Sequence, residues 1–148
     1  MNYTEEIARE TKDPKILTDI LSAYNLNNTK VYDYWVPECA AQNPNCPPEI
    51  LVEILKKGNE DDVSKYAAGN PNCPPEMLIE VLRRKNDSRF INYVSIHAVD
   101  NPNCPPEILT EILERGKYDK ISWNAVENPN CPDEAKIKWM QATDKIEK

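Results

Sequence analysis

The sequence of 148 residues contains little glycine, one histidine and no long apolar run. Its three glycines are isolated, so the chain has no glycine-rich loop that could hold a phosphate. His97 has no partner pattern of cysteine or carboxylate, and no Ser-His-Asp triad can be assembled around it. No apolar run approaches the ~18 residues that cross a bilayer, and the first residues lack the basic and apolar regions of a signal peptide. We therefore expect a cytoplasmic protein that contacts no membrane and is not an enzyme.

Acidic residues outnumber basic ones, with 25 Asp and Glu against 18 Lys and Arg, which gives a net charge of −7. This charge argues against nucleic acid and anionic membranes as partners. It is compatible with an alternative function, in which the chain is a small acidic, phage-encoded inhibitor that occupies the basic site of a nucleic-acid enzyme. The length suits one domain and the composition shifts sharply nowhere, so residues 1–148 are expected to form a single repeat domain.

A repeated segment organises most of the chain. Four copies begin at Gln42, Gly69, Asp100 and Glu127, and the first reads QNPNCPPEILVEIL. They hold 11 of the 13 prolines, so the high proline content reflects the repeat and not disorder. A weaker copy, DPKILTDIL, begins at Asp13. The predicted units are a degenerate N-terminal cap over 1–30 and four repeats over 31–58, 59–86, 87–116 and 117–148.

The second half of each unit predicts a helix that begins near the repeated cysteine. Cys46 occupies the expected N-cap, Pro47 the first helical position and Glu49 the third, which is the spacing of a capping box. Gly58 and Gly116 follow the helix where a C′ residue is expected. The apolar stripe of this helix in the first clear copy is Ile50, Leu51, Ile54 and Leu55. We expect the second stripe residue of three copies to be buried: Leu51, Leu78 and Leu109.

The first half of each unit predicts a shorter helix with a narrow packing face. A valine or isoleucine lies four residues before an alanine in four copies: Val36, Val63, Val94 and Ile121. An asparagine before a proline ends this helix in each copy: Asn43, Asn70, Asn101 and Asn128. Neither helix can bury its apolar face alone, and no alternating strand pattern occurs. The sequence therefore predicts an all-α solenoid of about five short helix pairs without a sheet.

The segment VSKYAAGNPNCPPEML, which begins at Val63, resembles the leucine-rich repeat variant family. That family repeats a Val-x-x-x-Ala step, an Asn-Pro turn and a short Pro-x-x-Leu-Leu helix, and the resemblance covers about Val36 to Met140. It implies a right-handed superhelix of α-helices and shorter, sometimes 3₁₀, helices, in a bacterial or phage protein. The family unit is about two dozen residues, whereas Cys73 and Cys104 are 31 residues apart here, so the first helix can be a full α-helix in the longer units.

The repeated cysteines are Cys46, Cys73, Cys104 and Cys131. A tetrahedral metal site needs metal–sulfur bonds of ~2.3 Å, whereas neighbouring helices are ~8–10 Å apart, so stacking should keep these thiols separate. We expect small buried residues, no metal, no cofactor and no disulfide. Cys39 and Cys46 are the one local pair in which such chemistry could occur. A regulatory protein that binds a metal or haem through its cysteines is the remaining alternative.

Basic residues cluster at the predicted ends of the second helices. They are Lys56 and Lys57, then Arg83, Arg84 and Lys85, then Arg115 and Lys117. Positive charge at helix C-termini explains each cluster locally, although a row of such clusters would also suit phosphates.

The two residues before each repeated alanine should face outward if the valine and alanine positions pack inward. These pairs are Glu38 and Cys39, Lys65 and Tyr66, Ile96 and His97, and Trp123 and Asn124. They differ in every copy and include large apolar groups, as a binding surface on a constant scaffold would require. We predict that the following residues bind another protein: Tyr66, Ile96, His97 and Trp123, with Tyr34 and Trp35 just upstream of one unit. Phe90 and Tyr93 lie upstream of a later unit in the same way.

Overall fold

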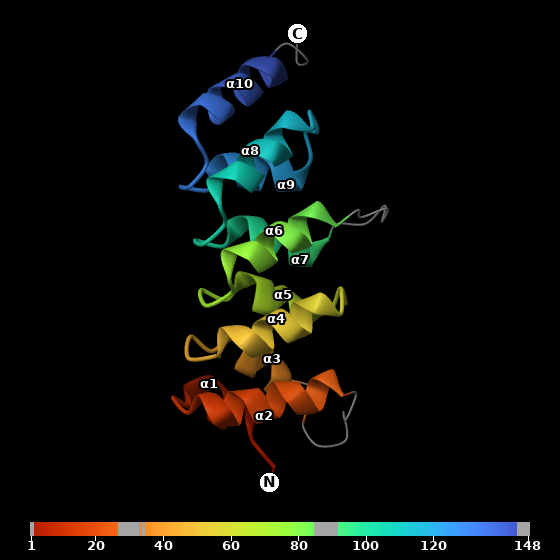
Figure 1. Cartoon of the computed structure of the whole chain (residues 1–148), viewed down its shortest axis with the longest axis vertical. Coiled ribbons are helices and arrows are strands. Elements are labelled where there is room, and N and C mark those ends of the chain that lie inside the picture. Colours follow the sequence, from red (N-terminus) through yellow and green to blue (C-terminus); the bar gives the residue numbers. More distant parts are fainter. Residues whose placement is uncertain (1, 27–32, 34, 85–91, 145–148) are drawn as a thin grey trace.

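A computed structural model describes residues 2–26, 33, 35–84 and 92–144 of the chain. These residues form ten helices and no strand, which confirms the prediction of an all-helical protein for the described ranges. The helices are α1 (Glu5–Glu10), α2 (Pro14–Asn25), α3 (Trp35–Gln42), α4 (Pro48–Lys56), α5 (Asp62–Gly69), α6 (Pro75–Arg83), α7 (Tyr93–Asp100), α8 (Pro106–Glu114), α9 (Lys120–Glu127) and α10 (Asp133–Asp144). They follow one another along the long axis, and the two termini lie at opposite ends (Figure 1). In the described ranges, no helix is both long enough and apolar enough to span a membrane.

The helices alternate between two sets, which we call A (α1, α3, α5, α7, α9) and B (α2, α4, α6, α8, α10). Each A helix contacts the next A helix along the axis, from α1 to α9. In the B set, α2 contacts α4, α4 contacts α6, and α8 contacts α10. Each B helix except the last also contacts the A helix that follows it. The repeat observed in the sequence is thus expressed as five helix pairs in the described part of the chain.

The core lies between the two sets of helices. Leu51, Leu78 and Leu109 are 0% exposed, which confirms that the second position of each apolar stripe is buried. On α10, Lys136 occupies the equivalent position and is half-buried. The repeated alanines of the A helices are also 0% exposed: Ala40, Ala67, Ala98 and Ala125. Their small side chains allow successive A helices to approach closely.

The prediction of a capping box at the start of the B helices is wrong for α4, α6 and α8. The N-cap of α4 is Pro47, its first helical residue is Pro48, and no side chain caps it. A residue that precedes a proline is pushed toward extended geometry, and Pro47 has φ −64° and ψ 139°, so the helix cannot begin before Pro48. This shift places Glu49 in the second helical position and makes Cys46 a fully buried core residue.

The A helices have side-chain caps that the sequence analysis did not identify. The carboxylate of Asp61 accepts a hydrogen bond from the backbone N–H of Ser64 at 2.8 Å. Asn92 caps α7 in the same way, and Asp119 caps α9. Each cap lies three residues before a buried serine, and these serines are Ser64, Ser95 and Ser122. A serine at this position of the repeat therefore marks the first turn of a capped helix.

The repeated asparagine ends each A helix and also bonds to the preceding unit. Asn101 is the C-cap of α7, with extended φ −64° and ψ 132°, as predicted for a residue before proline. Its side-chain amide donates to the carbonyl of Ala68 at 2.7 Å and to that of Asn70 at 2.9 Å. Its side-chain oxygen accepts from the backbone N–H of Asn103 at 2.8 Å. Asn43, Asn70 and Asn128 make equivalent bonds, so a buried row of asparagines connects the units.

The second asparagine of the turn extends this row toward the surface. Asn72 donates to the carbonyls of Pro44 and Cys46, at 2.6 and 2.9 Å. Asn130 makes the same pair of bonds to Pro102 and Cys104. Both asparagines of the Asn-Pro-Asn turn therefore have a structural role, which is to satisfy backbone carbonyls of the unit before.

Candidate interaction surface

The outward positions of α5, α7 and α9 form the surface that the sequence predicts for binding. Tyr66, Ile96 and His97 are half-buried, and Trp123 is 44% exposed. Tyr93, the first residue of α7, is 61% exposed and lies three residues before Ile96, so the two share a helix face. Because α7 contacts both α5 and α9, these five residues occupy neighbouring helices. We call them the A face: Tyr66, Tyr93, Ile96, His97 and Trp123.

Aromatic contacts connect the α5 and α7 parts of the A face. The rings of Tyr66 and His97 meet edge to face, with centroids 6.1 Å apart. The ammonium of Lys65 lies 4.5 Å from the centre of the Tyr66 ring and 2.6 Å from the carboxylate of Asp62. Burial lowers the pKa of His97, and the positive charge of Lys65 adds to this effect, while Asp100 opposes it. The imidazole is therefore neutral near pH 7 and serves as a packing surface for Tyr66.

Trp123 on α9 is packed on one side and exposed on the other. Its ring meets that of Trp139 on α10 edge to face, with centroids 4.7 Å apart. Trp139 is itself 3% exposed, and its ring centroid lies 5.4 Å from that of Tyr118. Its Nε1–H donates to the carbonyl of Lys117 at 3.3 Å. These contacts hold Trp123 in a fixed orientation, which lowers the entropy that an aromatic anchor would lose on binding.

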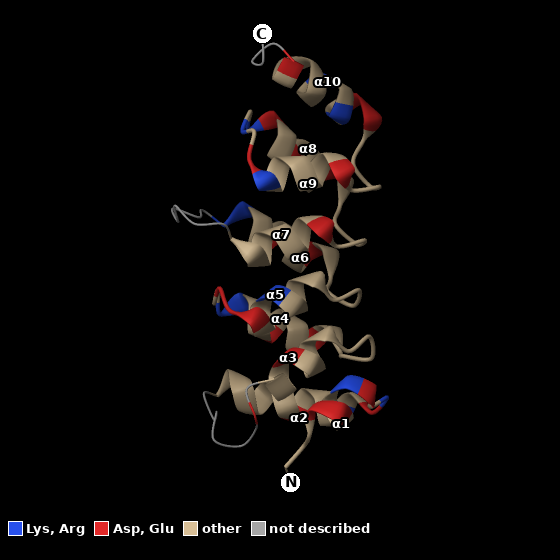
Figure 2. Cartoon of the chain, turned by 180° about the vertical axis from the view of Figure 1, so that it is seen from behind, with Lys and Arg blue, Asp and Glu red and all other residues tan. Residues whose placement is uncertain are grey.

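Charge is confined to the ends of the two helices that carry most of the A face. α7 has one acidic residue, Asp100, at its last position. In α9, Lys120 is first and Glu127 is last. Figure 2 shows both helices as mostly tan ribbons, with coloured segments toward their ends. The middle of this surface is therefore apolar and uncharged, with a charged rim, as in the core and rim of protein interfaces.

Three of the predicted outward positions are buried instead. Glu38 and Cys39 are 3% and 7% exposed because α3 contacts both α1 and α5, and Cys39 Sγ lies 3.6 Å from Nη2 of Arg9 on α1. Burial, together with the nearby charge of Asp62, raises the pKa of Glu38. Asn124 is 6% exposed and donates to both carboxylate oxygens of Asp100. The outward assignment is thus wrong for these three residues, because the fold buries them against neighbouring elements that the helical period alone does not reveal.

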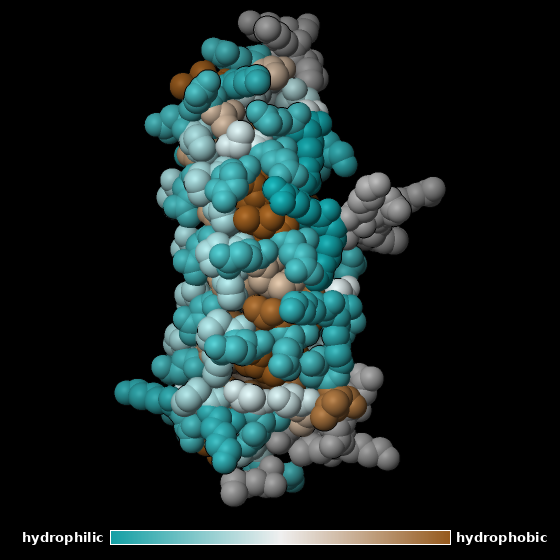
Figure 3. All heavy atoms as spheres, viewed as in Figure 1, coloured by the Kyte–Doolittle hydropathy of each residue, from teal (hydrophilic) through white to brown (hydrophobic). Residues whose placement is uncertain are grey.

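The upstream aromatics of the first long unit are only partly described. Trp35 is 60% exposed at the start of α3, on a helix that does not carry the A face. Tyr34 and Phe90 lie outside the described residues. In the view of Figure 3, the surface is mostly hydrophilic, and hydrophobic atoms appear in small separate areas. Apolar residues that are exposed singly are ordinary on a protein surface and need no function.

The basic residues at the ends of the B helices cap the preceding B helix. Nη1 of Arg84 donates to the carbonyl of Leu55 at 2.6 Å. Arg115 reaches the carbonyl of Leu82 at 3.4 Å, and Lys57 donates to the carbonyl of Asn25. The repeated cations therefore have a structural role between units, which the local helix-dipole explanation anticipated only in part.

The five cysteines are buried free thiols. Burial raises the pKa of three of them to about 12, and these are Cys46, Cys73 and Cys104. A thiol that stays protonated at neutral pH is a poor nucleophile and a poor metal ligand. Among the described residues, no group of three or more His, Cys, Asp and Glu side chains is placed to hold a metal ion.

Comparison with known proteins gives no relative. No family model, curated protein or solved structure matches the chain.

Proposed function

We propose that this chain is a non-catalytic module that binds another protein through the A face. The observation that carries the proposal is the contrast between constant and variable positions of the A helices. The packed position is an alanine in four units and is 0% exposed in each, whereas the outward position two residues before it changes from Lys65 to Ile96 to Trp123. A scaffold that is constant inside and variable outside presents a specific surface, and exposed Tyr and Trp are typical anchors of protein interfaces.

The arrangement of the helices supports the finer architecture that we propose, a right-handed α-solenoid related to the leucine-rich repeat variant family. The support is the stacking of A helices on A helices and the Asn-Pro-Asn turn that recurs between the two helices of a unit. A bacterial or phage protein that works in the cytoplasm is the setting that the resemblance implies. A solenoid of this kind offers a large surface for its number of residues, which suits recognition more than catalysis.

Affinity capture tests the proposal. The tagged chain is incubated with a lysate of the source cell, and captured proteins are identified by mass spectrometry. Tyr93→Ala combined with Trp123→Ala should weaken binding of a specific partner by about 700-fold, because each buried aromatic anchor contributes ~2 kcal/mol and the two together contribute ~4 kcal/mol. The matched control replaces two exposed apolar residues outside the A face, Leu26→Ala and Ile137→Ala, which are 81% and 55% exposed.

The opposite pattern of binding by the two variants would refute the proposal. A partner that the A-face variant binds as tightly as the unchanged chain, while the control variant loses it, would move the interface to the B helices and refute the assignment. Circular dichroism must show that both variants stay folded. Loss of the edge-to-face contact between Trp123 and Trp139 should cost only about 0.5–1.5 kcal/mol.

A further inference from the structure

The last B helix lacks the cation that caps the preceding helix elsewhere. Arg84 and Arg115 each lie nine residues after the first residue of their helix, α6 and α8. The position nine residues after Asp133, the first residue of α10, is Ala142. The carboxylate that holds each arginine is also replaced, because Glu80 pairs with Arg84 at 3.0 Å, whereas Lys138 occupies that position in α10.

The C-terminus of α8 consequently has an open acceptor. The carbonyl of Leu55 accepts from the backbone N–H of Gly58 at 3.1 Å and from Arg84 at 2.6 Å. The equivalent carbonyl of Leu113 accepts from the backbone N–H of Gly116 at 3.2 Å, and no described side chain donates to it. A Cβ atom added to Gly58 would lie 3.8 Å from Nη1 of Arg84, whereas one added to Gly116 would meet nothing within 4 Å.

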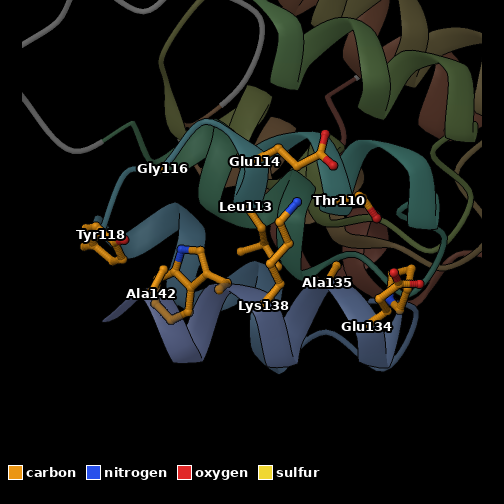
Figure 4. Close-up of a pocket in the computed structure, with 11 residues that line it drawn as sticks. Thr110, Leu113, Glu114, Gly116, Tyr118, Glu134, Ala135, Lys138 and Ala142 are labelled. Atoms are coloured by element: carbon orange, nitrogen blue, oxygen red, sulfur yellow. The ribbon is translucent and has the colours of Figure 1, made fainter. Parts of the chain in front are cut away.

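A groove of about 650 Å³ lies between α8 and α10 at this place. Leu113, Gly116 and Ala142, the three residues that mark the missing cap, all line it. Figure 4 shows α8 and α10 as its two walls, with Leu113 and Lys138 pointing into the space between them. Tyr118 lies toward one end of the groove and Glu134 toward the other.

The walls of the groove suit a planar cation. The carbonyls at the C-terminus of α8 carry partial negative charge, and Glu114 and Glu134 add two carboxylates against the single ammonium of Lys138. The ring of Tyr118, which is 39% exposed, supplies aromatic surface, on which a guanidinium stacks more favourably than an ammonium. Arginine is also the residue that fills the equivalent position at the two units before.

We propose that the groove between α8 and α10 binds the guanidinium group of an arginine side chain from a partner protein. The guanidinium donates to the carbonyl of Leu113, as Arg84 donates to that of Leu55, and faces the carboxylate of Glu114. The groove is lined by α8, α10 and the segment before α9, and it touches the A face only through the contact between Trp139 and Trp123. Tyr93→Ala and Tyr66→Ala therefore test the A face without altering the groove, and Ala142→Arg and Glu114→Gln test the groove without altering the A face.

The first experiment measures binding of N-acetyl-L-argininamide to the full chain by NMR. The backbone N–H of Gly116 and the indole N–H of Trp139 should shift together and saturate, with a dissociation constant on the order of millimolar for so small a ligand. N-acetyl-L-citrullinamide has the same shape without the charge, and it should bind roughly 10-fold more weakly. Equal binding of the two probes would overturn the proposal.

Variants of the groove supply the second experiment. Ala142→Arg should restore the cap from within, abolish binding of the probe and raise the melting temperature by about 2–4 °C relative to Ala142→Gln. Glu114→Gln should weaken binding several-fold, and Lys138→Gln should strengthen it, because the first removes an attracting charge and the second a repelling one. An Ala142→Arg protein that still binds the probe would overturn the proposal, as would stronger binding to Glu114→Gln. If Ala142→Arg does not fold, the opposite effects expected of Glu114→Gln and Lys138→Gln still test the proposal.

Two other occupants of the groove would contradict the proposal. If the unchanged chain binds no probe and the variant Lys145→Gln with Lys148→Gln does, the groove is filled by the chain's own lysines. If sedimentation shows a dimer that Ala142→Arg dissociates, the groove binds a second copy. A saturable, arginine-selective shift in a monomer supports the assignment to a partner's arginine.

Discussion

Replacement of Asn101 by alanine should destabilise the protein strongly, although the residue contacts no candidate binding site. Asn101 is 1% exposed and makes three hydrogen bonds, two as a donor to the carbonyls of Ala68 and Asn70 and one as an acceptor from the N–H of Asn103. Each bond contributes about 1 kcal/mol, and a buried group left without a partner costs about 1–3 kcal/mol. Asn101→Ala should therefore lower the free energy of unfolding by roughly 3–5 kcal/mol.

Urea unfolding followed by circular dichroism measures this change. The matched control is Asn59→Ala, because Asn59 is an exposed asparagine and its replacement should stay within about 0.5 kcal/mol. The dependence on denaturant should be unchanged, so that the shift in midpoint reports stability and not a change in the unfolded state. A loss below about 1 kcal/mol for Asn101→Ala would refute the view that the asparagine row holds the units together.

Asn101→Asp separates hydrogen bonding from shape. Aspartate keeps the acceptor for Asn103 but puts a second oxygen against the carbonyls of Ala68 and Asn70. Burial beside two carbonyls raises the pKa of such a carboxyl above its unfolded value. The variant should therefore be closest to the unchanged protein at acidic pH, where the carboxyl is protonated, and lose stability relative to it as the pH rises. The opposite pH dependence would refute the assigned bonding.

Four further predictions concern the core and the bonds between units. Leu78→Ala should cost about 2–5 kcal/mol in urea unfolding, because Leu78 is 0% exposed; an unchanged midpoint would contradict the assigned packing face. Cys73→Ser should cost about 1–3 kcal/mol, because Cys73 is a buried core residue and not the N-cap; a gain in stability would contradict this. Stability should fall above pH 9, since the thiol pKa of about 12 in Cys46, Cys73 and Cys104 exceeds the ordinary value of 9.0, by about 1.4 kcal/mol per pH unit for each thiol. A triple alanine variant whose alkaline slope equals that of the unchanged protein would argue against this origin. Arg84→Met should cost about 1 kcal/mol by uncapping Leu55, and hydrogen exchange should accelerate at the end of α4; unchanged exchange there would contradict the cap.

The helices and their buried faces could be predicted because they depend on local spacing. Helical period identified Leu51, Leu78 and Leu109 as core residues, and the step from asparagine to proline located the end of each A helix. The start of the B helix was misplaced by one residue. Cysteine, proline and glutamate at that spacing match a capping box, but a second proline forces its predecessor into extended geometry.

The candidate surface was harder to predict because exposure depends on neighbours. The same helical offset is half-buried at Tyr66 and buried at Cys39, because α1 covers α3. Aligning the repeats shows that Ala142 occupies the position of Arg84 and Arg115, so the loss of a cation could be predicted from the sequence. That this cation caps the preceding helix is known only from the contact between Arg84 and Leu55. Helical periodicity within one segment does not predict which residues of different units contact each other.

The bonds between units follow one direction, and this direction bears on the choice of partner. The asparagine amides and the repeated cations both donate from a later unit to the carbonyls that end a helix of the unit before, as Asn101 does to Ala68 and Arg84 does to Leu55. Each helix end carries partial negative charge, so a cation there is stabilised in place and is partly withdrawn from solvent. Arg84 and Arg115 also pair with Glu80 and Glu111, which further offsets their charge. A row of cations that is engaged in this way attracts phosphates less than its sequence suggests, which leaves the net charge of −7 and the apolar A face as reasons to prefer a protein partner.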